Sequence, residues 1–170
     1  SAFNFPVAVW AWNTALAWVC GNVTIWKGSA KTPLCSVACQ KIWNDIATEN
    51  NLPEGISNII TGDFKVGEMM TTDKRVNLVS ATGSTRMGRE VQKVVGERFG
   101  KTLLELGGNN ALIVSDKADL KLAIPAIVFG AVGTCGQRCT STRRIIAHKS
   151  IKSKLIENIK SAYQQIKIGN

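Results

Sequence analysis

Apolar and polar positions along the 170-residue chain form two kinds of segment, short apolar runs and longer periodic stretches. The short runs, which are rich in apolar and β-branched residues, predict strands. They lie at residues 6–9, 23–26, 56–60, 76–81, 102–106, 111–114 and 145–147. Strands that alternate with helices are typical of a parallel sheet with helices on both faces, so we predict an α/β fold. Ligands of such sheets bind beyond the carboxyl ends of the strands.

Three of the longer stretches have the features of helices. The first begins at Thr32-Pro33, where a capping hydroxyl and a proline in the first turn favour a helix start. Its apolar positions recur every four residues along one face, at Leu34, Ala38, Ile42 and Ile46. The other two predicted helices occupy residues 84–99 and 151–166.

The first 26 residues carry no charge and are long enough to span a bilayer. Pro6, Asn13, Gly21 and Asn22 divide them into a short strand, a short helix and the start of a second strand. This pattern favours a buried α/β core, and we expect no membrane anchor. Because the chain starts within apolar sequence and stops just after a helical stretch, we expect it to be a middle portion of a longer protein.

The composition, with 45% hydrophobic residues, is that of a globular protein that forms one domain or parts of two. The five cysteines are an odd number and form no dense framework. They predict a reducing compartment, either the cytoplasm or the mitochondrial matrix of a eukaryote, and at least one free thiol.

The net charge of +9 lies entirely in the second half of the chain. Residues 1–85 carry 6 Lys and Arg against 6 Asp and Glu, whereas residues 86–170 carry 15 against 6. A basic nucleic-acid-binding module is one hypothesis. The cations are nevertheless spaced along helical segments without interleaved aromatic residues, so we favour a solvated face and expect no nucleic-acid partner.

Two cysteine pairs have a spacing that zinc sites use, Cys35 with Cys39 and Cys135 with Cys139. A zinc-stabilised interaction domain is therefore a second hypothesis. Cys35 and Cys39 lie in a predicted helix, where buried thiols are the default, and we expect Cys20 to be buried as well. Neither pair lies in a knuckle-like turn, so we expect no metal.

Cys139 differs from the other thiols in its surroundings. Arg138, Arg143 and Arg144 lie near it in the sequence, and Gly136 frees the backbone. Cationic neighbours favour a thiolate, so Cys139 is a candidate nucleophile.

Polar residues at predicted strand ends and helix starts have alternative interpretations. Ser84 could cap a helix or help to hold a phosphate, and Lys27 could add a cation or be solvated. Glu105 could be an edge-strand glutamate or a general base. Asn13 could donate from its amide, although we favour a helix N-cap.

Five motifs resemble the NAD(P)-dependent aldehyde dehydrogenase superfamily in order and spacing. They are AWN at 11–13, WKG at 26–28, TGST at 82–85, LELGG at 104–108 and GQRC at 136–139. The stretches GNVTIWKG, LELGGNNA and GTCGQRCTSTRR look most like the antiquitin branch, the alpha-aminoadipic semialdehyde dehydrogenases. The resemblance covers all 170 residues.

This resemblance implies oxidation of a small-molecule aldehyde. Cys139 would be the nucleophile, and the Asn13 amide and the Cys139 N–H would hold the oxyanion. Glu105 would activate the water that hydrolyses the thioester.

The resemblance also implies a dinucleotide cofactor. Lys27 would contact the adenosine ribose, Ser84 and Gly83 the pyrophosphate, and Trp12 would belong to the same site. NAD is expected, with NADP not excluded, because Ala30 stands where many NAD-preferring members have a glutamate.

The implied organisation is a variant Rossmann-like dinucleotide-binding domain at residues 1–107, joined to the start of an α/β catalytic domain at residues 108–170. The full-length protein would be a homo-oligomer, a tetramer by resemblance. We expect this chain to be inactive alone.

Overall fold

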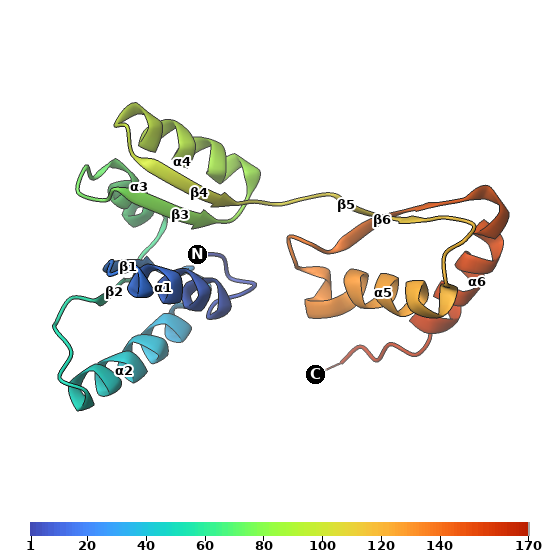
Figure 1. The fold of residues 1–170 in the computed structure, drawn as a ribbon, viewed down its shortest axis with the longest axis horizontal. Helices are drawn as coiled ribbons and strands as arrows, with labels where there is room; N and C mark the ends of the chain where they lie inside the picture. The colour runs from blue at the N-terminus through green and yellow to red at the C-terminus, as the bar shows by residue number, and fades with distance from the viewer. Residues whose placement is uncertain (170) are drawn as a thin grey trace. The chain divides into compact units, whose positions relative to one another are not determined.

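The computed structural model describes residues 1–169 and has an α/β architecture (Figure 1). The chain divides into two compact units, of which the first is Ser1–Leu106 and the second begins at Gly107. Each unit pairs parallel strands and packs helices against them. The predicted α/β class with parallel strands is confirmed.

The first unit contains four helices and four strands. In order they are α1 (Ala8–Val19), β1 (Thr24–Lys27), α2 (Pro33–Glu49), β2 (Ser57–Ile60), α3 (Phe64–Thr72), β3 (Leu78–Thr82), α4 (Thr85–Glu97) and β4 (Lys101–Glu105). β1 pairs in parallel with β2, and β3 pairs in parallel with β4. The two registers end with Lys27 opposite Ile60 and Thr82 opposite Glu105. The expected functional positions Lys27 and Glu105 are therefore the last residues of strands.

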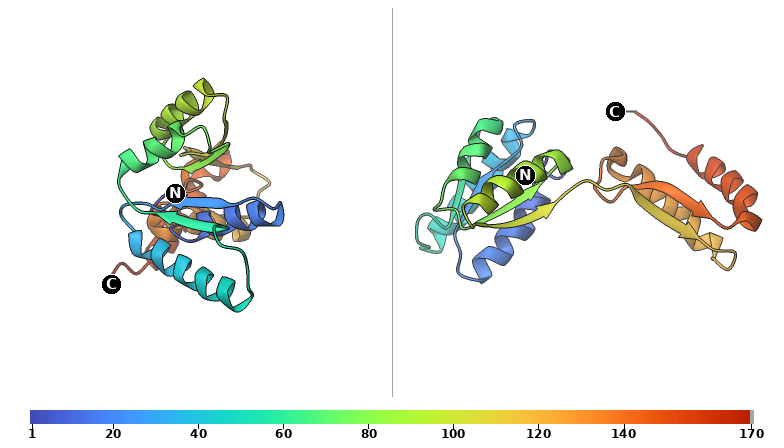
Figure 2. Two further views of the ribbon diagram at one scale, coloured as in Figure 1. Left: turned by 90° about the vertical axis from the view of Figure 1, so that its left-hand side faces the viewer. Right: turned by 90° about the horizontal axis from the view of Figure 1, so that it is seen from above.

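Helices of the first unit pack against specific strands (Figure 2). α1 contacts β1, α2 contacts β2, and α4 contacts both β3 and β4, while α3 packs against α4. Tryptophans join α1, β1 and α2. Trp10 stacks on Trp26 with ring centroids 4.9 Å apart, and Trp18 lies 4.1 Å from Trp43. Aromatic burial of this kind is a large contribution to a small core.

The second unit contains β5 (Asn110–Val114), α5 (Leu120–Val132), a 3-10 turn (Gly133–Gly136), β6 (Thr142–Ala147), a second 3-10 turn (Lys149–Ile151) and α6 (Lys152–Tyr163). β5 and β6 are parallel, with a register shift between Asn110 and Ala111. α5 packs against β6 and α6, and the buried residues Val114, Ile127 and Leu155 form the core.

Three predictions about the chain's elements are wrong. Residues 6–9 are no strand, since α1 begins at Ala8, and Asn13 lies inside that helix instead of capping it. Periodicity cannot distinguish a short apolar strand from the start of an apolar helix. The Thr32 hydroxyl makes no capping hydrogen bond, although Thr32 does precede α2 and Pro33 is in its first turn.

The cysteine burial predictions are also wrong. Cys20 is exposed because it follows the last turn of α1, and Cys35 and Cys39 are only partly buried in α2. The apolar face predicted on α2 is solvent-exposed as well, since Leu34, Ile42 and Ile46 are all exposed.

The strands form three separate two-stranded pairs among the described residues. Helices α3 and α5 had no predicted bounds. None of the helices in residues 1–169 has the length and apolar content that a bilayer span requires.

Candidate functional site

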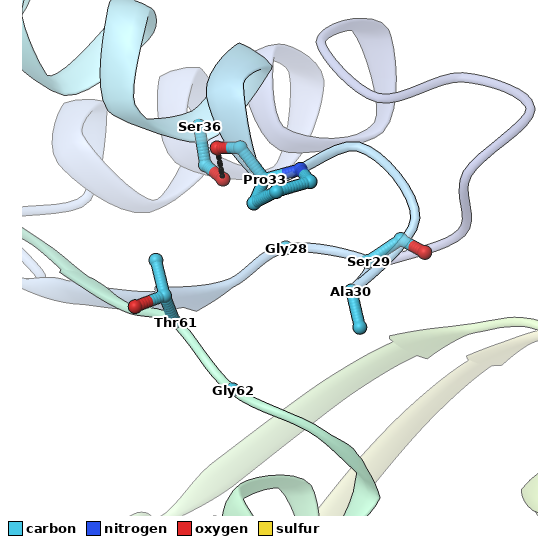
Figure 3. A pocket seen from close by; sticks show the side chains of 7 residues that line it. All are labelled: Gly28, Ser29, Ala30, Pro33, Ser36, Thr61 and Gly62. Atoms are coloured by element: carbon cyan, nitrogen blue, oxygen red, sulfur yellow. Dashed lines mark hydrogen bonds between the residues drawn. The ribbon is translucent and has the colours of Figure 1, made fainter.

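The carboxyl ends of β1 and β2 border a small pocket (Figure 3). It is lined by Gly28, Ser29, Ala30, Pro33, Ser36, Thr61 and Gly62, which follow β1, begin α2 and follow β2. Lys27 is the last residue of β1 and is partly buried. The pocket lies at the edge formed by the ends of the two strands. Its volume is about 10 Å³, which leaves room for about one water.

Two glycines let the backbone approach its neighbours at this edge. A Cβ at Gly28 would lie 2.6 Å from Ser36 Oγ, and a Cβ at Gly62 would lie 2.5 Å from a methyl of Val66. The Ser36 hydroxyl donates to Pro33 O at 2.9 Å and is buried. No carboxylate lines the pocket, and Ala30 presents only a methyl group.

Ser84 begins α4 directly after β3. Its hydroxyl accepts from the Met87 N–H at 3.2 Å, so the predicted N-cap is confirmed. The hydroxyl proton remains available to an acceptor, because a serine can donate and accept at once. Gly83 N–H donates to Glu105 O at 3.0 Å, which ties the ends of β3 and β4 together. This N–H is occupied, and a Cβ at Gly83 would lie 2.6 Å from the Met87 Cε, so the absence of a side chain at Gly83 makes room for Met87.

Asn13 lies inside α1, and two hydrogen bonds orient its side chain. Its Nδ2 donates to Val9 O at 2.7 Å, and its Oδ1 accepts from Ser80 Oγ at 2.7 Å. An amide nitrogen carries two protons, so one remains for a further acceptor. Ser80 was not singled out from the sequence, although a lone serine within the apolar strand β3 was a usable signal.

Glu105 is exposed at the end of β4. Its backbone is held by strand pairing with Thr82 and by the hydrogen bond that the Gly83 N–H donates to Glu105 O. Asn13, Lys27, Gly83 and Ser84 belong to the same unit, as does Trp12, which is 46% exposed on α1.

Cys139 belongs to the second unit and is exposed on the loop between the 3-10 turn and β6. Its carbonyl accepts from Asn110 Nδ2 at 2.7 Å, and the same nitrogen lies 3.2 Å from Ser141 O. Asn110 is a second residue that the sequence did not mark. It lies within the stretch LELGGNNA, but nothing in that stretch assigned it a role.

The other thiols offer little support for a metal centre. Burial raises the pKa of the Cys39 thiol, and the neighbouring Cys35 raises it further, which disfavours the thiolate that zinc requires. Within residues 1–169, no three His, Cys, Asp or Glu side chains are grouped as metal ligands.

Comparison with known proteins identifies the class of protein to which these features belong, namely the strand-end residues, the capped α4 and the exposed cysteine loop. The whole chain, residues 1–170, matches the model of the aldehyde dehydrogenase family, and the chain belongs to this family. It is 52% identical to an alpha-aminoadipic semialdehyde dehydrogenase of Mus musculus and 49% identical to aldehyde dehydrogenase family 7 member B4 of Arabidopsis thaliana, each over 170 residues. The predicted resemblance to this family and to its antiquitin branch is confirmed.

Solved structures agree in fold. A lactaldehyde dehydrogenase from Escherichia coli superposes with a TM-score of 0.93 at 34% identity, covering 99% of this chain and 35% of that one. A glyceraldehyde-3-phosphate dehydrogenase of Methanocaldococcus jannaschii complexed with NADP gives 0.94 at 36% identity, covering 100% and 37%. The matches to the mouse and Arabidopsis relatives cover 100% of this chain but only 32% and 34% of those proteins, respectively. The chain therefore spans about a third of their length.

Proposed function

We propose that the full-length protein containing this chain is an NAD(P)-dependent aldehyde dehydrogenase. The observation that carries the proposal is an exposed Cys139 on a hydrogen-bonded loop in a chain that matches the family over its whole length. We assign cofactor binding to the first unit and the start of the catalytic domain to the second, and we expect the protein to assemble as a homo-oligomer.

The first unit has features that fit a dinucleotide. Lys27 at the end of β1 would meet the adenosine ribose, and Ser84 with the free N–H groups of the first turn of α4 would meet the pyrophosphate. Gly83 would lie beside the pyrophosphate, next to Ser84, and Trp12 is exposed on α1. When bound, the nicotinamide ring would accept a hydride from the aldehyde carbon.

Cys139 would begin the reaction. Its thiolate attacks the aldehyde carbon and forms a C–S bond, which places a negative charge on the former carbonyl oxygen. The remaining Asn13 amide proton and the Cys139 N–H would stabilise this oxyanion. The bonds from Asn13 to Val9 and Ser80 support this role, because they orient the amide before substrate arrives.

Glu105 would act after hydride departure, when the acyl group is a thioester on Cys139. The carboxylate takes a proton from water, and the resulting hydroxide attacks the thioester carbon. Cleavage of the C–S bond releases a carboxylic acid and the Cys139 thiolate, to which Glu105 then returns its proton. An exposed carboxylate at a strand end supports this role, because it can reach water.

Alpha-aminoadipic semialdehyde is our proposed substrate because the mouse relative carries that name. NAD is our proposed cofactor, and the absence of a carboxylate among the residues that line the pocket after β1 leaves NADP as an alternative.

The roles of Cys139 and Glu105 can be separated in the full-length protein by Glu105→Gln and Cys139→Ala. Glu105→Gln should form NADH in a burst that approaches the enzyme concentration and then stall, because hydride transfer does not need the deacylating base. Cys139→Ala should give no burst. Stopped-flow absorbance of NADH measures both.

The exposed Glu90 on α4 offers a matched control, and Glu90→Gln should turn over normally. Slow turnover without a burst in Glu105→Gln, with cofactor still bound, would contradict the assignment of Glu105. NADH formation by Cys139→Ala would contradict the assignment of the nucleophile.

A further inference from the structure

The loop around Cys139 is held by hydrogen bonds on both sides of that residue, all within the second unit. We propose that Asn110 is a positioning residue, whose side-chain amide fixes the backbone that presents the Cys139 thiol and N–H. The inference rests on the proposed function, in which Cys139 is the nucleophile.

Asn110 holds the peptide group that follows Cys139. Its Nδ2 donates to the Cys139 carbonyl at 2.7 Å and lies 3.2 Å from the Ser141 carbonyl. A peptide group is planar, so a bond to its oxygen restrains the orientation of the whole group. The rotation about the Cys139 Cα–C bond is therefore limited.

Ser141 holds the peptide group that precedes Cys139. Its N–H donates to Arg138 O at 3.2 Å, and its buried hydroxyl accepts from the Arg138 N–H at 3.1 Å. Arg138 O and the Cys139 N–H belong to one trans peptide and point in opposite directions. The bond to Ser141 thus aims the Cys139 N–H away from Ser141, and Asn110 in turn holds the carbonyl of Ser141.

The base of the loop needs this support because its backbone is locally unfavourable. Thr134 and Cys135 have φ of 55° and 53°, in the left-handed region that non-glycine residues rarely adopt. Arg138 contacts this turn, since its Nε donates to Thr134 Oγ1 at 3.0 Å and its guanidinium lies 4.8 Å from the Phe129 ring centroid. Strain of this kind persists only where surrounding contacts impose it.

Asn110 reaches the loop from a defined place. It is the first residue of β5, opposite Thr142, and the register shifts directly after it. Gly108 leaves room for the contact, because a Cβ there would lie 2.8 Å from Asn110 Oδ1 and 3.3 Å from Cys139 O. A methyl at position 108 would push the amide and the carbonyl apart.

The test uses Asn110→Ala and Asn110→Asp in the full-length protein. The aspartate keeps the shape of the side chain but has no N–H to donate. Both variants should lower the rate of the first-turnover NADH burst by about tenfold or more, because the Cys139 N–H is no longer held where the oxyanion forms. Gly108→Ala should lower it in the same direction, and the exposed neighbour Asn109 provides Asn109→Ala as the matched control.

Alkylation of Cys139 by iodoacetamide separates positioning from folding. This displacement forms no oxyanion, so its rate in the Asn110 variants should stay close to that of the unsubstituted protein, as should the thermal midpoint. A parallel loss of burst rate, alkylation and thermal stability would assign Asn110 a merely structural role and overturn the proposal.

Two further outcomes distinguish this inference from the proposed function. An unchanged burst rate in both Asn110 variants, beside an inactive Cys139→Ala, would overturn the positioning role alone. NADH formation by Cys139→Ala would overturn the proposed function, and the positioning role with it.

Discussion

At the scale of single residues, the five thiols differ in exposure and in surroundings. Cys20, Cys135 and Cys139 are exposed, whereas Cys35 and Cys39 are partly buried in α2. Exposure alone does not distinguish Cys139 from Cys135, which is only four residues away. The distinguishing features of Cys139 are the bonds that hold its backbone and its closer cationic sequence neighbours.

These differences predict an order of alkylation in the full-length protein. Brief iodoacetamide treatment near neutral pH should label Cys139 fastest, and Cys39 should be among the slowest because burial raises the pKa of its thiol. Peptide mapping by mass spectrometry measures the order. Preferential labelling of Cys135 would move the nucleophile to that position.

At the scale of secondary-structure elements, Ser84 has one observed role and one proposed role at the start of α4. Its side chain caps the helix by accepting from Met87, and its hydroxyl is expected to contact the cofactor pyrophosphate. Aspartate is also a good N-cap, but its negative charge repels phosphate. The two roles therefore respond differently to two substitutions.

Ser84→Ala should lower the free energy of unfolding by about 1 kcal/mol and weaken cofactor binding. Ser84→Asp should keep the stability and weaken cofactor binding more strongly, because in the proposed site the added carboxylate would face the pyrophosphate. Denaturant unfolding and titration with NADH, followed by tryptophan fluorescence, measure the two quantities. Undiminished NADH affinity in Ser84→Asp would remove Ser84 from the cofactor site.

At the scale of the whole molecule, the chain exposes many large apolar side chains. Leu34, Ile42 and Ile46 lie on α2, and Leu16 and Val19 lie on α1 with exposures of 70% and 89%. Contiguous apolar surface is usually covered in a stable soluble protein. Because the chain spans about a third of its relatives, the remainder of such a protein is our proposed cover.

The chain produced alone should therefore self-associate, bind an apolar dye and hold NAD only weakly. Sedimentation velocity and dye fluorescence measure association and exposed apolar surface, and equilibrium dialysis measures NAD binding. The full-length protein is the control and should show little dye binding. A monomeric chain that unfolds cooperatively and binds NAD tightly would contradict this expectation.

Much of the fold was predictable from local sequence patterns. The bounds of β1, β3 and α4 differ from the predicted ranges by two residues or fewer, and Ser84 caps α4 as expected. Apolar runs, turn residues and capping side chains act over a few neighbours, so they are readable without a structure. The roles of Cys139 and Glu105 rest on the family motifs and stay proposals.

Tertiary structure decided which polar groups meet. Asn13 receives a hydrogen bond from Ser80, 67 residues away, and Asn110 reaches the carbonyl of Cys139, 29 residues away. These pairs depend on the tertiary packing that brings Asn13 of α1 to Ser80 of β3, and on the register shift of β5 against β6. Packing and strand register arise from contacts between distant segments, and local sequence patterns carry no information about such contacts.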